Sequence, residues 1–265
     1  MLKFYWNLMN SLMTERDGDE LKHSAVVFSP HPDDETLGCG GTIIQKINAG
    51  ANVCVVFMTD GCRSHPHLIS EEQLKSVRKT EALAATQILG VERNNVHFLE
   101  FKDKELWQNQ KTVTDKVIDI LLYYKPKEVF IPYHKEIPSD HWATNRIILQ
   151  ALQKYREKIT VYEYPIWFWN QWPWVPTSFG LRLKTIRILK NTVLSNVHFL
   201  SDFRFSVATY TVLESKRAAL HEYKSQMTRL IPDQKWITLP DVSRGKFLNC
   251  FFQPHEIFRG YCLYG

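Results

Sequence analysis

The sequence lacks any run of apolar residues long enough to cross a membrane. A transmembrane helix needs about 20 consecutive, mostly apolar residues, and polar or charged residues interrupt the apolar stretches of this 265-residue chain. The hydrophobic fraction of 44% and the charged fraction of 23% are ordinary for a globular protein. We therefore do not expect an integral membrane protein.

We also expect no secretory signal in the N-terminal segment, residues 1–24. Its apolar opening, MLKFYWNLMNSLM, is interrupted by Trp6, Asn7 and Asn10, and no small-residue cleavage site follows. We expect a helix here that docks on the protein, with contact to a membrane surface as the alternative.

Cysteine pairs are absent as well. The five cysteines are odd in number and widely spaced, and none belongs to a C-x-x-C motif. Disulfide frameworks and cysteine-ligated zinc sites both need such pairs, so the pattern argues against both. It favours the reducing cytoplasm as the compartment.

Acidic residues are missing from one long stretch, residues 164–201. The stretch holds four tryptophans and four of the basic residues behind the net charge of +5: Trp167, Trp169, Trp172, Trp174, Arg182, Lys184, Arg187 and Lys190. Aromatic residues spaced this closely between prolines follow neither a helical nor a strand period, so we expect a structured loop. Its charge indicates a partner that is not cationic, and we expect no nucleic-acid partner for the chain.

Short β-branched runs alternate with longer helical patterns over the first 165 residues. This alternation is typical of βαβ units around a parallel sheet. The signals for helix ends agree with this alternation. Ser70 and Gln73 form a capping box at a helix start, and Gly50 and Gly90 stand where helices should end. The expected strands cover residues 25–29, 52–59, 95–101, 128–133 and 160–164.

These elements predict an α/β fold, a Rossmann-like, doubly wound parallel sheet packed between layers of helices. We expect a single domain over residues 25–265 with an elaborated C-terminal part, and we treat residues 165–203 as a Trp-rich, basic insertion. In such sheets, ligands bind outside the carboxyl ends of the strands. Three loops at that edge carry histidines with carboxylates: SPHPDDE, TDGCRSHPH and YHKEIPSDHWATN.

The first of these loops is followed by glycines, which raises the question of a phosphate cradle. Gly38, Gly40 and Gly41 fit neither the dinucleotide-binding fingerprint nor the P-loop, which needs a lysine after its last glycine. The acidic residues Asp33, Asp34 and Glu35 would also repel a phosphate from the helix N-terminus. The cluster instead predicts a bound cation.

A divalent metal explains the residue types. Hydrolytic zinc sites use about three His, Asp or Glu ligands and leave one position open for water. His31 and Asp34 are three residues apart in a turn, and His141 can close the site from a second loop, which leaves Asp33 as a base. Two simpler interpretations remain open: HPDD is only a turn that caps a helix, and Ser139 or Asp140 is only a helix N-cap.

Four segments together resemble one known family. PHPDDETLGCGGT, SDHWATN, VRKTEALAATQILGV and KRAALHEYKSQ are similar to the LmbE-like or PIG-L family of zinc-dependent N-deacetylases, whose members remove acetyl groups from N-acetylglucosamine-type amino sugars. The resemblance implies Zn²⁺ on His31, Asp34 and His141, and Asp33 as the general base. It also implies that Arg78 contacts the sugar, with an exposed helical arginine beside Glu81 as the alternative.

The resemblance has one departure. Many relatives carry a histidine three residues before the last metal ligand, where this chain has Pro138. The group that helps the amine to leave is therefore unassigned, and His134, Lys135 and His255 are candidates. Two other functions stay open: a Rossmann-like cofactor-binding enzyme such as a methyltransferase, and a catalytically idle module that binds glycans or membrane surfaces.

The tryptophan-rich stretch follows the last predicted strand, so it is expected to reach the catalytic edge. We hypothesise that Trp172 and Trp174 stack on the substrate while Arg182, Lys184 or Arg187 meets an anionic part of it. The alternative is that the rings only fill the core. The expected partner is a small amino-sugar conjugate, and a peripheral contact with a lipid-linked substrate is left open.

Overall fold

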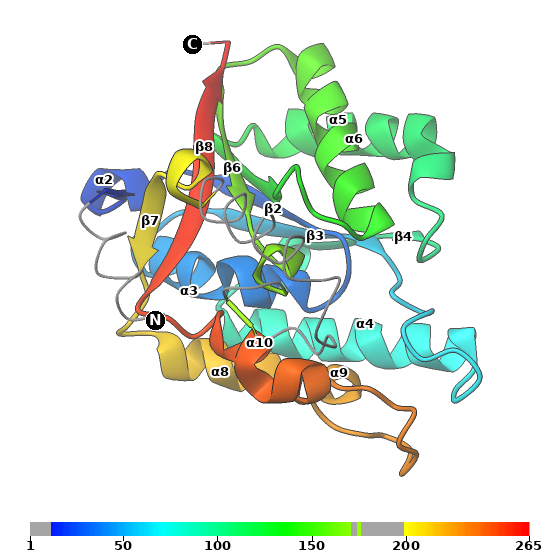
Figure 1. The fold of residues 1–265 in the computed structure, drawn as a ribbon. Coiled ribbons are helices and arrows are strands. Elements are labelled where there is room, and N and C mark those ends of the chain that lie inside the picture. The colour runs from blue at the N-terminus through cyan, green and yellow to red at the C-terminus, as the bar shows by residue number, and fades with distance from the viewer. Residues whose placement is uncertain (1–11, 171–173, 176–198, 265) are drawn as a thin grey trace, which may run out of the picture.

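The computed structural model describes residues 12–170, 174–175 and 199–264. In this part of the chain, one eight-stranded mixed sheet lies between two layers of helices (Figure 1). The strands run in the spatial order β1-β7-β8-β6-β5-β2-β3-β4. Their bounds are β1 Thr14–Glu15, β2 Ala25–Ser29, β3 Val53–Thr59, β4 Val96–Phe101, β5 Glu128–Pro132, β6 Ile159–Tyr164, β7 Phe205–Ala208 and β8 His255–Leu263.

The parallel half of the sheet confirms the fold that the sequence predicts. β4, β3, β2, β5 and β6 are all parallel neighbours, and each matches a predicted strand to within one residue at either end. Val27 of β2 pairs with Val55 on one side and Phe130 on the other. Because every residue of β2, β3 and β5 is buried, these strands read as nearly continuous apolar runs.

The remaining strands correct the expectation of a purely parallel sheet. β8 runs antiparallel to both β6 and β7, and β1 pairs with β7. The C-terminal part therefore extends the same sheet. Residues 14–15 of the N-terminal segment join it too, while the helix predicted for the apolar opening falls largely on residues 1–11, outside the described residues.

Helices cover both faces of the sheet (Figure 1). One face carries α3 (Asp34–Asn48), α4 (Glu71–Ile88) and α8 (Leu213–His221), and the other carries α5 (Gln110–Tyr124) and α6 (Ser139–Tyr155). Each side has its own apolar core. The shorter helices are α2 Gly18–Leu21, η1 Arg93–Asn95, η2 Trp107–Asn109, η3 Trp167–Trp169, α9 Lys224–Met227, η4 Leu239–Gly245 and α10 Lys246–Asn249.

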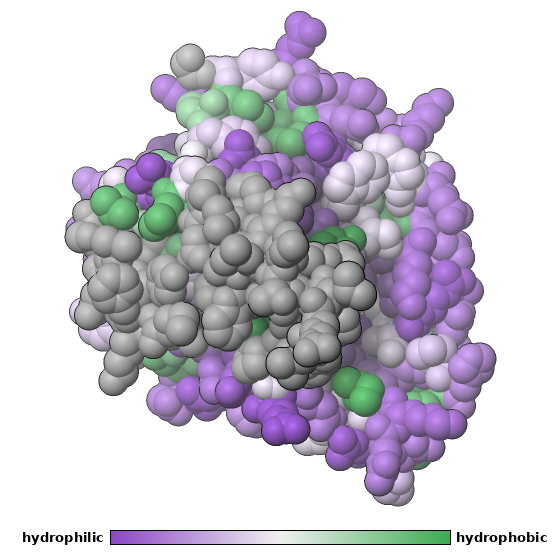
Figure 2. All heavy atoms as spheres, viewed as in Figure 1, coloured by the Kyte–Doolittle hydropathy of each residue, from purple (hydrophilic) through white to green (hydrophobic). Residues whose placement is uncertain are grey.

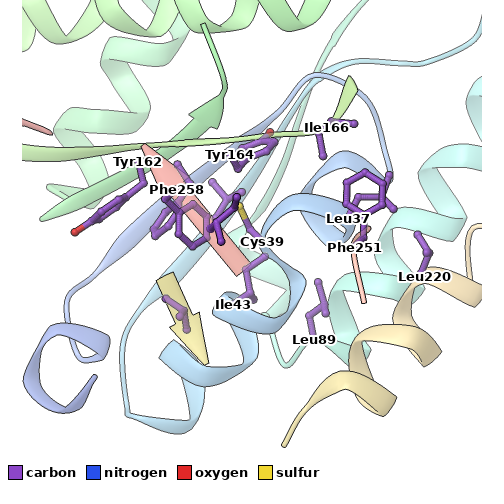
Figure 3. Close-up of a cluster of buried hydrophobic side chains, with 14 of the residues drawn as sticks. Leu37, Cys39, Ile43, Leu89, Tyr162, Tyr164, Ile166, Leu220, Phe251 and Phe258 are labelled. Carbon is purple, nitrogen blue, oxygen red and sulfur yellow. The ribbon is translucent and has the colours of Figure 1, made fainter. Parts of the chain in front are cut away.

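The glycines of α3 serve packing. The cluster in Figure 3 brings side chains of α3, α8, β6 and β8 together. A Cβ on Gly38 would lie 2.4 Å from Cδ2 of Tyr164, and one on Gly41 would lie 2.5 Å from Cγ2 of Thr209. The helix therefore packs closer to its neighbours than larger residues would allow. This close packing explains the glycines, so no phosphate-binding role is needed for them.

Among the described residues, no helix is both long and apolar enough to cross a membrane. Outside the grey atoms, the face seen in Figure 2 is mostly hydrophilic, with hydrophobic residues in small separate groups. All five cysteines are free thiols. The absence of disulfides agrees with the sequence pattern.

Candidate metal centre and active site

Three side chains from two loops converge at the carboxyl edge of the sheet. His31 and Asp34 belong to the turn between β2 and α3, and His141 lies in the first turn of α6, which follows β5. Oδ2 of Asp34 is 3.2 Å from Nδ1 of His31 and 3.1 Å from Nε2 of His141. One ligand atom from each residue lies within 4.8 Å of the other two, so the predicted ligand set is brought together.

The environment of His141 fits a metal. Its side chain is completely buried, and neither ring nitrogen has a hydrogen-bond partner. Nε2 is close to Asp34, and Nδ1 is 3.6 Å from Oε2 of Glu136, but neither contact has hydrogen-bond geometry. A buried polar atom without a hydrogen-bond partner destabilises the fold. A metal ion bound by Asp34 and His31 would give Nε2 of His141 a partner. Two imidazoles and a carboxylate are also the donors that zinc prefers.

The low pKa of the Asp34 carboxyl also favours a metal site. Burial alone would raise the pKa of the Asp34 carboxyl, but the adjacent His141 and His31 outweigh burial and hold that pKa well below its usual range. The carboxylate is thus ionised and available as a ligand at neutral pH.

Asp33 adjoins this cluster in a strained conformation. Its φ of 127° and ψ of −29° are unusual for a residue with a side chain. The backbone N–H of Asp33 donates to Oε2 of Glu35 at 3.1 Å, and its carboxylate lies 3.1 Å from Nη2 of Arg78. Burial raises the pKa of Asp33 to about 8, an effect that Arg78 opposes and the neighbouring Asp34 reinforces. The side chain therefore has the character of a base.

Arg78 lies in the interior of the protein. Only 3% of it is exposed, and its guanidinium donates to the carbonyl oxygens of Gly61 and Pro32 besides pairing with Asp33. Glu81 instead accepts hydrogen bonds from the backbone and hydroxyl of Ser225. The alternative of an exposed helical arginine beside Glu81 is therefore wrong.

Two carboxylates that were not predicted as site residues, Asp103 and Asp140, contact the far side of His31. Nε2 of His31 lies 3.3 Å from Oδ2 of Asp140 and 3.4 Å from Oδ1 of Asp103. Burial lowers the pKa of His31, but the three surrounding carboxylates outweigh it and raise that pKa well above its usual value. His31, Asp103 and Asp140 form a second group with metal-site spacing. Carboxylates in such positions commonly fix the orientation of a ligating histidine.

The interpretation of Ser139 or Asp140 as a helix N-cap is wrong. Pro138 occupies the N-cap of α6 and provides no side-chain hydrogen bond. The Asp140 carboxylate instead accepts a hydrogen bond from the backbone N–H of Lys104 at 2.7 Å. Asp103 and Lys104 directly follow β4, so the rule that ligands bind at the carboxyl edge would have found them.

A cavity of about 340 Å³ opens beside this cluster, within the usual range for small-molecule sites. Its polar side is lined by His31, Asp33, Asp34, Arg78, Asp103 and Lys104. His65, from the loop after β3, also lines it; this ring stacks on Trp236 at 4.2 Å and contacts the carbonyl oxygen of Ile237 at 3.0 Å. His65 thereby ties the C-terminal part to the cavity wall.

The structure does not support the predicted helper groups. His134 contacts Oε2 of Glu163 at 2.7 Å, Lys135 pairs with Asp202, and none of these side chains lines the cavity. His255 lies 3.5 Å from Glu15 and is also outside the cavity. Each candidate therefore contacts an acidic partner away from the cavity lining.

The tryptophan hypothesis is corrected in part. Trp174 is 3% exposed and packs against Phe168, Trp169 and Phe199 in the core, so the core-filling alternative holds for it. Trp167, from the same stretch, does line the cavity. Trp172, Arg182, Lys184 and Arg187 lie outside the described residues.

Comparison with known proteins gives the same assignment as the motifs. Residues 26–152 match the family model described as PIG-L: GlcNAc-PI de-N-acetylase. The chain is 32% identical over 106 residues to diacetylchitobiose deacetylase of Thermococcus kodakarensis, and 31% identical over 140 residues to a probable N-acetyl-alpha-D-glucosaminyl L-malate deacetylase 2 of Bacillus cereus. The alignments cover 40% and 50% of this chain, and 39% and 62% of these relatives, so the chain spans only part of their length.

The fold has a counterpart among solved structures. N,N'-diacetylchitobiose deacetylase from Pyrococcus horikoshii superposes with a TM-score of 0.65 at 21% identity, covering 90% of this chain and 84% of the other. At this identity the likeness shows the fold alone. The match over residues 26–152, which contain His31, Asp34 and His141, assigns this part of the chain to the PIG-L, or LmbE-like, family.

Proposed function

We propose that this protein is a metal-dependent hydrolase that removes the N-acetyl group from an N-acetylglucosamine-type amino sugar or its conjugate. The observation that carries the proposal is the cluster of His31, Asp34 and His141 with the basic, strained Asp33 beside it. Names of the relatives support it, because those proteins are described as deacetylases of diacetylchitobiose and of a glucosaminyl malate.

In this proposal His31, Asp34 and His141 hold Zn²⁺. When bound, zinc supplies Lewis acidity, which polarises an acetyl carbonyl and activates water at neutral pH. Asp33 accepts a proton from the attacking water. The C–N bond then breaks, the leaving amine takes up the proton that Asp33 accepted, and the products are acetate and a free amino sugar.

The residues around Asp33 keep it in place for this role. Glu35 holds its backbone N–H, and Arg78 contacts its carboxylate. Because Arg78 also lines the cavity, a sugar hydroxyl is the group we assign to it. Asp103 and Asp140 orient His31 through its second nitrogen.

The alternatives fit the site less well. The glycines of α3 are the feature that favours a methyltransferase-like cofactor binder. Because they are buried in packing contacts, they leave no room for a cofactor. An idle glycan- or membrane-binding module would have no use for a buried His141 that lies beside Asp34 and Glu136 without a hydrogen-bond partner. The free cysteines support our further proposal of a reducing, cytoplasmic compartment.

Acetate release from a panel of N-acetylhexosamine conjugates tests the proposed function. The zinc-loaded protein should release acetate and free amine in equal amounts, and a chelator should abolish both. Neutral conjugates of N-acetylgalactosamine and N-acetylmannosamine provide the comparison for the sugar. If no conjugate yields acetate from a folded, zinc-loaded protein, the proposed function is wrong.

A further inference from the structure

The cavity has two chemically different sides. The polar side, with the proposed catalytic groups, comes from residues 31–104, inside the family match. The lining residues beyond that match are mostly apolar. Ile166, Trp167, Ile237, Leu239, Val242 and Phe247 form what we call the apolar wall, and Gln226 and Thr238 are the polar residues among them. The wall is therefore formed by the segments in which this chain is elaborated.

The apolar wall has few free polar groups beside it, since Nε2 of Gln226 already donates to Oγ of Ser225 at 3.2 Å. Trp167 stacks on Phe247 with ring centroids 5.1 Å apart and an interplanar angle of 23°. Thr238 is the polar residue between Ile237 and Leu239, and its hydroxyl already donates to Oδ2 of Asp241 at 2.8 Å. Sugar hydroxyls placed against this wall would lose water without gaining hydrogen-bond partners.

Most cations of the described lining already have acidic partners. Arg63 pairs with Glu71 at 3.1 Å and with Glu105 at 2.7 Å, and Arg78 pairs with Asp33. Lys104 is the described lining cation without an acidic partner, and its ammonium donates to the carbonyl oxygen of Arg63. A carboxylate or phosphate would therefore find little uncompensated positive charge among the described lining residues.

We propose that the group attached to the amino sugar is neutral and apolar, an alkyl or aryl aglycone, and that it packs on the wall of Trp167, Leu239, Val242 and Phe247. This inference rests on the proposed function and adds the substrate class. Burial of an apolar group is favourable in proportion to its area, whereas an anionic group would lose hydration without a partner. The wall thus acts as the specificity-determining surface.

A series of glycosides of N-acetylglucosamine tests the inference. We would measure kcat/KM for acetate release from the methyl, hexyl and phenyl β-glycosides and from N-acetylglucosamine 1-phosphate, all below micellar concentrations. Each methylene removed from water favours binding by about fourfold. The hexyl glycoside should therefore exceed the methyl glycoside by about tenfold or more, mainly through a lower KM, and the phosphate should be the poorest substrate.

Variants of the wall connect that preference to the structure. Val242→Ser should lower the hexyl-to-methyl ratio of kcat/KM by about fivefold, because a hydroxyl replaces one methyl group against the aglycone and the second methyl group is lost. Val242→Leu keeps the apolar surface and should keep the ratio. Leu122→Ser is the matched control, since Leu122 is 53% exposed on α5 and does not line the cavity; its ratio should equal that of the parent.

The outcomes separate this inference from the function beneath it. Acetate release from the methyl glycoside without a gain for hexyl or phenyl overturns the aglycone assignment while the deacetylase function stands. A preference for the phosphate, or faster cleavage of an N-hexanoyl than of an N-acetyl group, also overturns it. No release from any glycoside overturns both proposals.

Discussion

Asp33 occupies a backbone conformation that costs free energy, and its neighbours hold it there. Its φ of 127° is compensated by the hydrogen bond from its N–H to Glu35, which is itself fixed by the hydroxyl of Tyr223 at 2.6 Å. Strain of this kind usually marks a functional position. The strain turns the Asp33 carboxylate toward Arg78 and the cavity, while Asp34 faces the two histidines.

Asp33→Asn tests whether this side chain is a base. The amide keeps the shape and removes the basicity, so kcat for acetate release should fall by about 10²-fold or more. Zinc content should stay at the parent level, because Asp33 is not one of the proposed ligands. Loss of zinc together with activity would make Asp33 a ligand, and undiminished turnover would remove it from the mechanism.

His141→Ala tests the ligand set. Removing one of three protein ligands should abolish most of the bound zinc in protein purified without chelator, measured by elemental analysis. His221→Ala is the control, because His221 belongs to the exposed end of α8 and does not line the cavity. Full zinc occupancy in His141→Ala would refute the assignment.

At the scale of elements, the parallel strands and their loops were predictable because local signals specify them. β2, β3 and β5 are buried on both faces, so each appears as an apolar run, and Ser70 caps α4 by accepting the N–H of Gln73, as its spacing predicts. The carboxyl-edge rule then placed His31, Asp34 and His141 together. This much follows from periodicity, caps and topology.

The antiparallel strand, the roles of the tryptophans and the role of Asp140 depend on contacts between distant segments. β8 pairs with β6 and β7 across about 100 and 50 residues, and no local pattern in HEIFRGYCL shows this. Trp174 and Trp167 have similar surroundings in sequence, but only the structure shows that the first fills the core and the second lines the cavity. In the sequence, Asp140 resembles a helix N-cap, but in the structure its carboxylate accepts the backbone N–H of Lys104.

Gly38→Ala tests the close approach of α3 to β6. The added Cβ would lie 2.4 Å from the Tyr164 ring, and overpacking of this kind costs typically about 1–3 kcal/mol of the free energy of unfolding. Gly40→Ala on the same helix is the matched control, because its nearest heavy atom is Cγ of Lys216 at 3.1 Å. Denaturant unfolding should show the larger loss for Gly38→Ala; equal losses would contradict this packing account.

At the scale of the whole molecule, one buried ion pair joins the C-terminal part to the catalytic half. Nζ of Lys216, in α8, donates to Oε1 of Glu256 in β8 at 2.7 Å and to the carbonyl oxygens of Leu37 and Phe251 at 2.8 Å. Glu256 in turn accepts the N–H groups of Gly41 and Thr42 at 2.8 Å. The helix that begins at the proposed metal ligand Asp34 is thus anchored to α8 and β8, the elements that precede and follow wall residues 237–247 in the chain.

Lys216→Met should therefore destabilise the entire fold. Removing one partner leaves the buried Glu256 carboxylate without its cation, which typically costs about 3–5 kcal/mol. The double variant Lys216→Met/Glu256→Gln should recover part of the loss, because the remaining buried charge is then removed. A single variant as stable as the parent in denaturant unfolding would show that the pair does not hold the two parts together.

The central claim is that His31, Asp34 and His141 hold one metal ion that amide hydrolysis requires. The most direct measurement is a zinc titration of chelator-treated protein, followed by acetate release from the methyl glycoside of N-acetylglucosamine. We predict no release without zinc, a linear rise with added metal, and saturation at about one equivalent per chain, in line with a single three-ligand site. Acetate release at the full rate by the metal-free protein would contradict the claim.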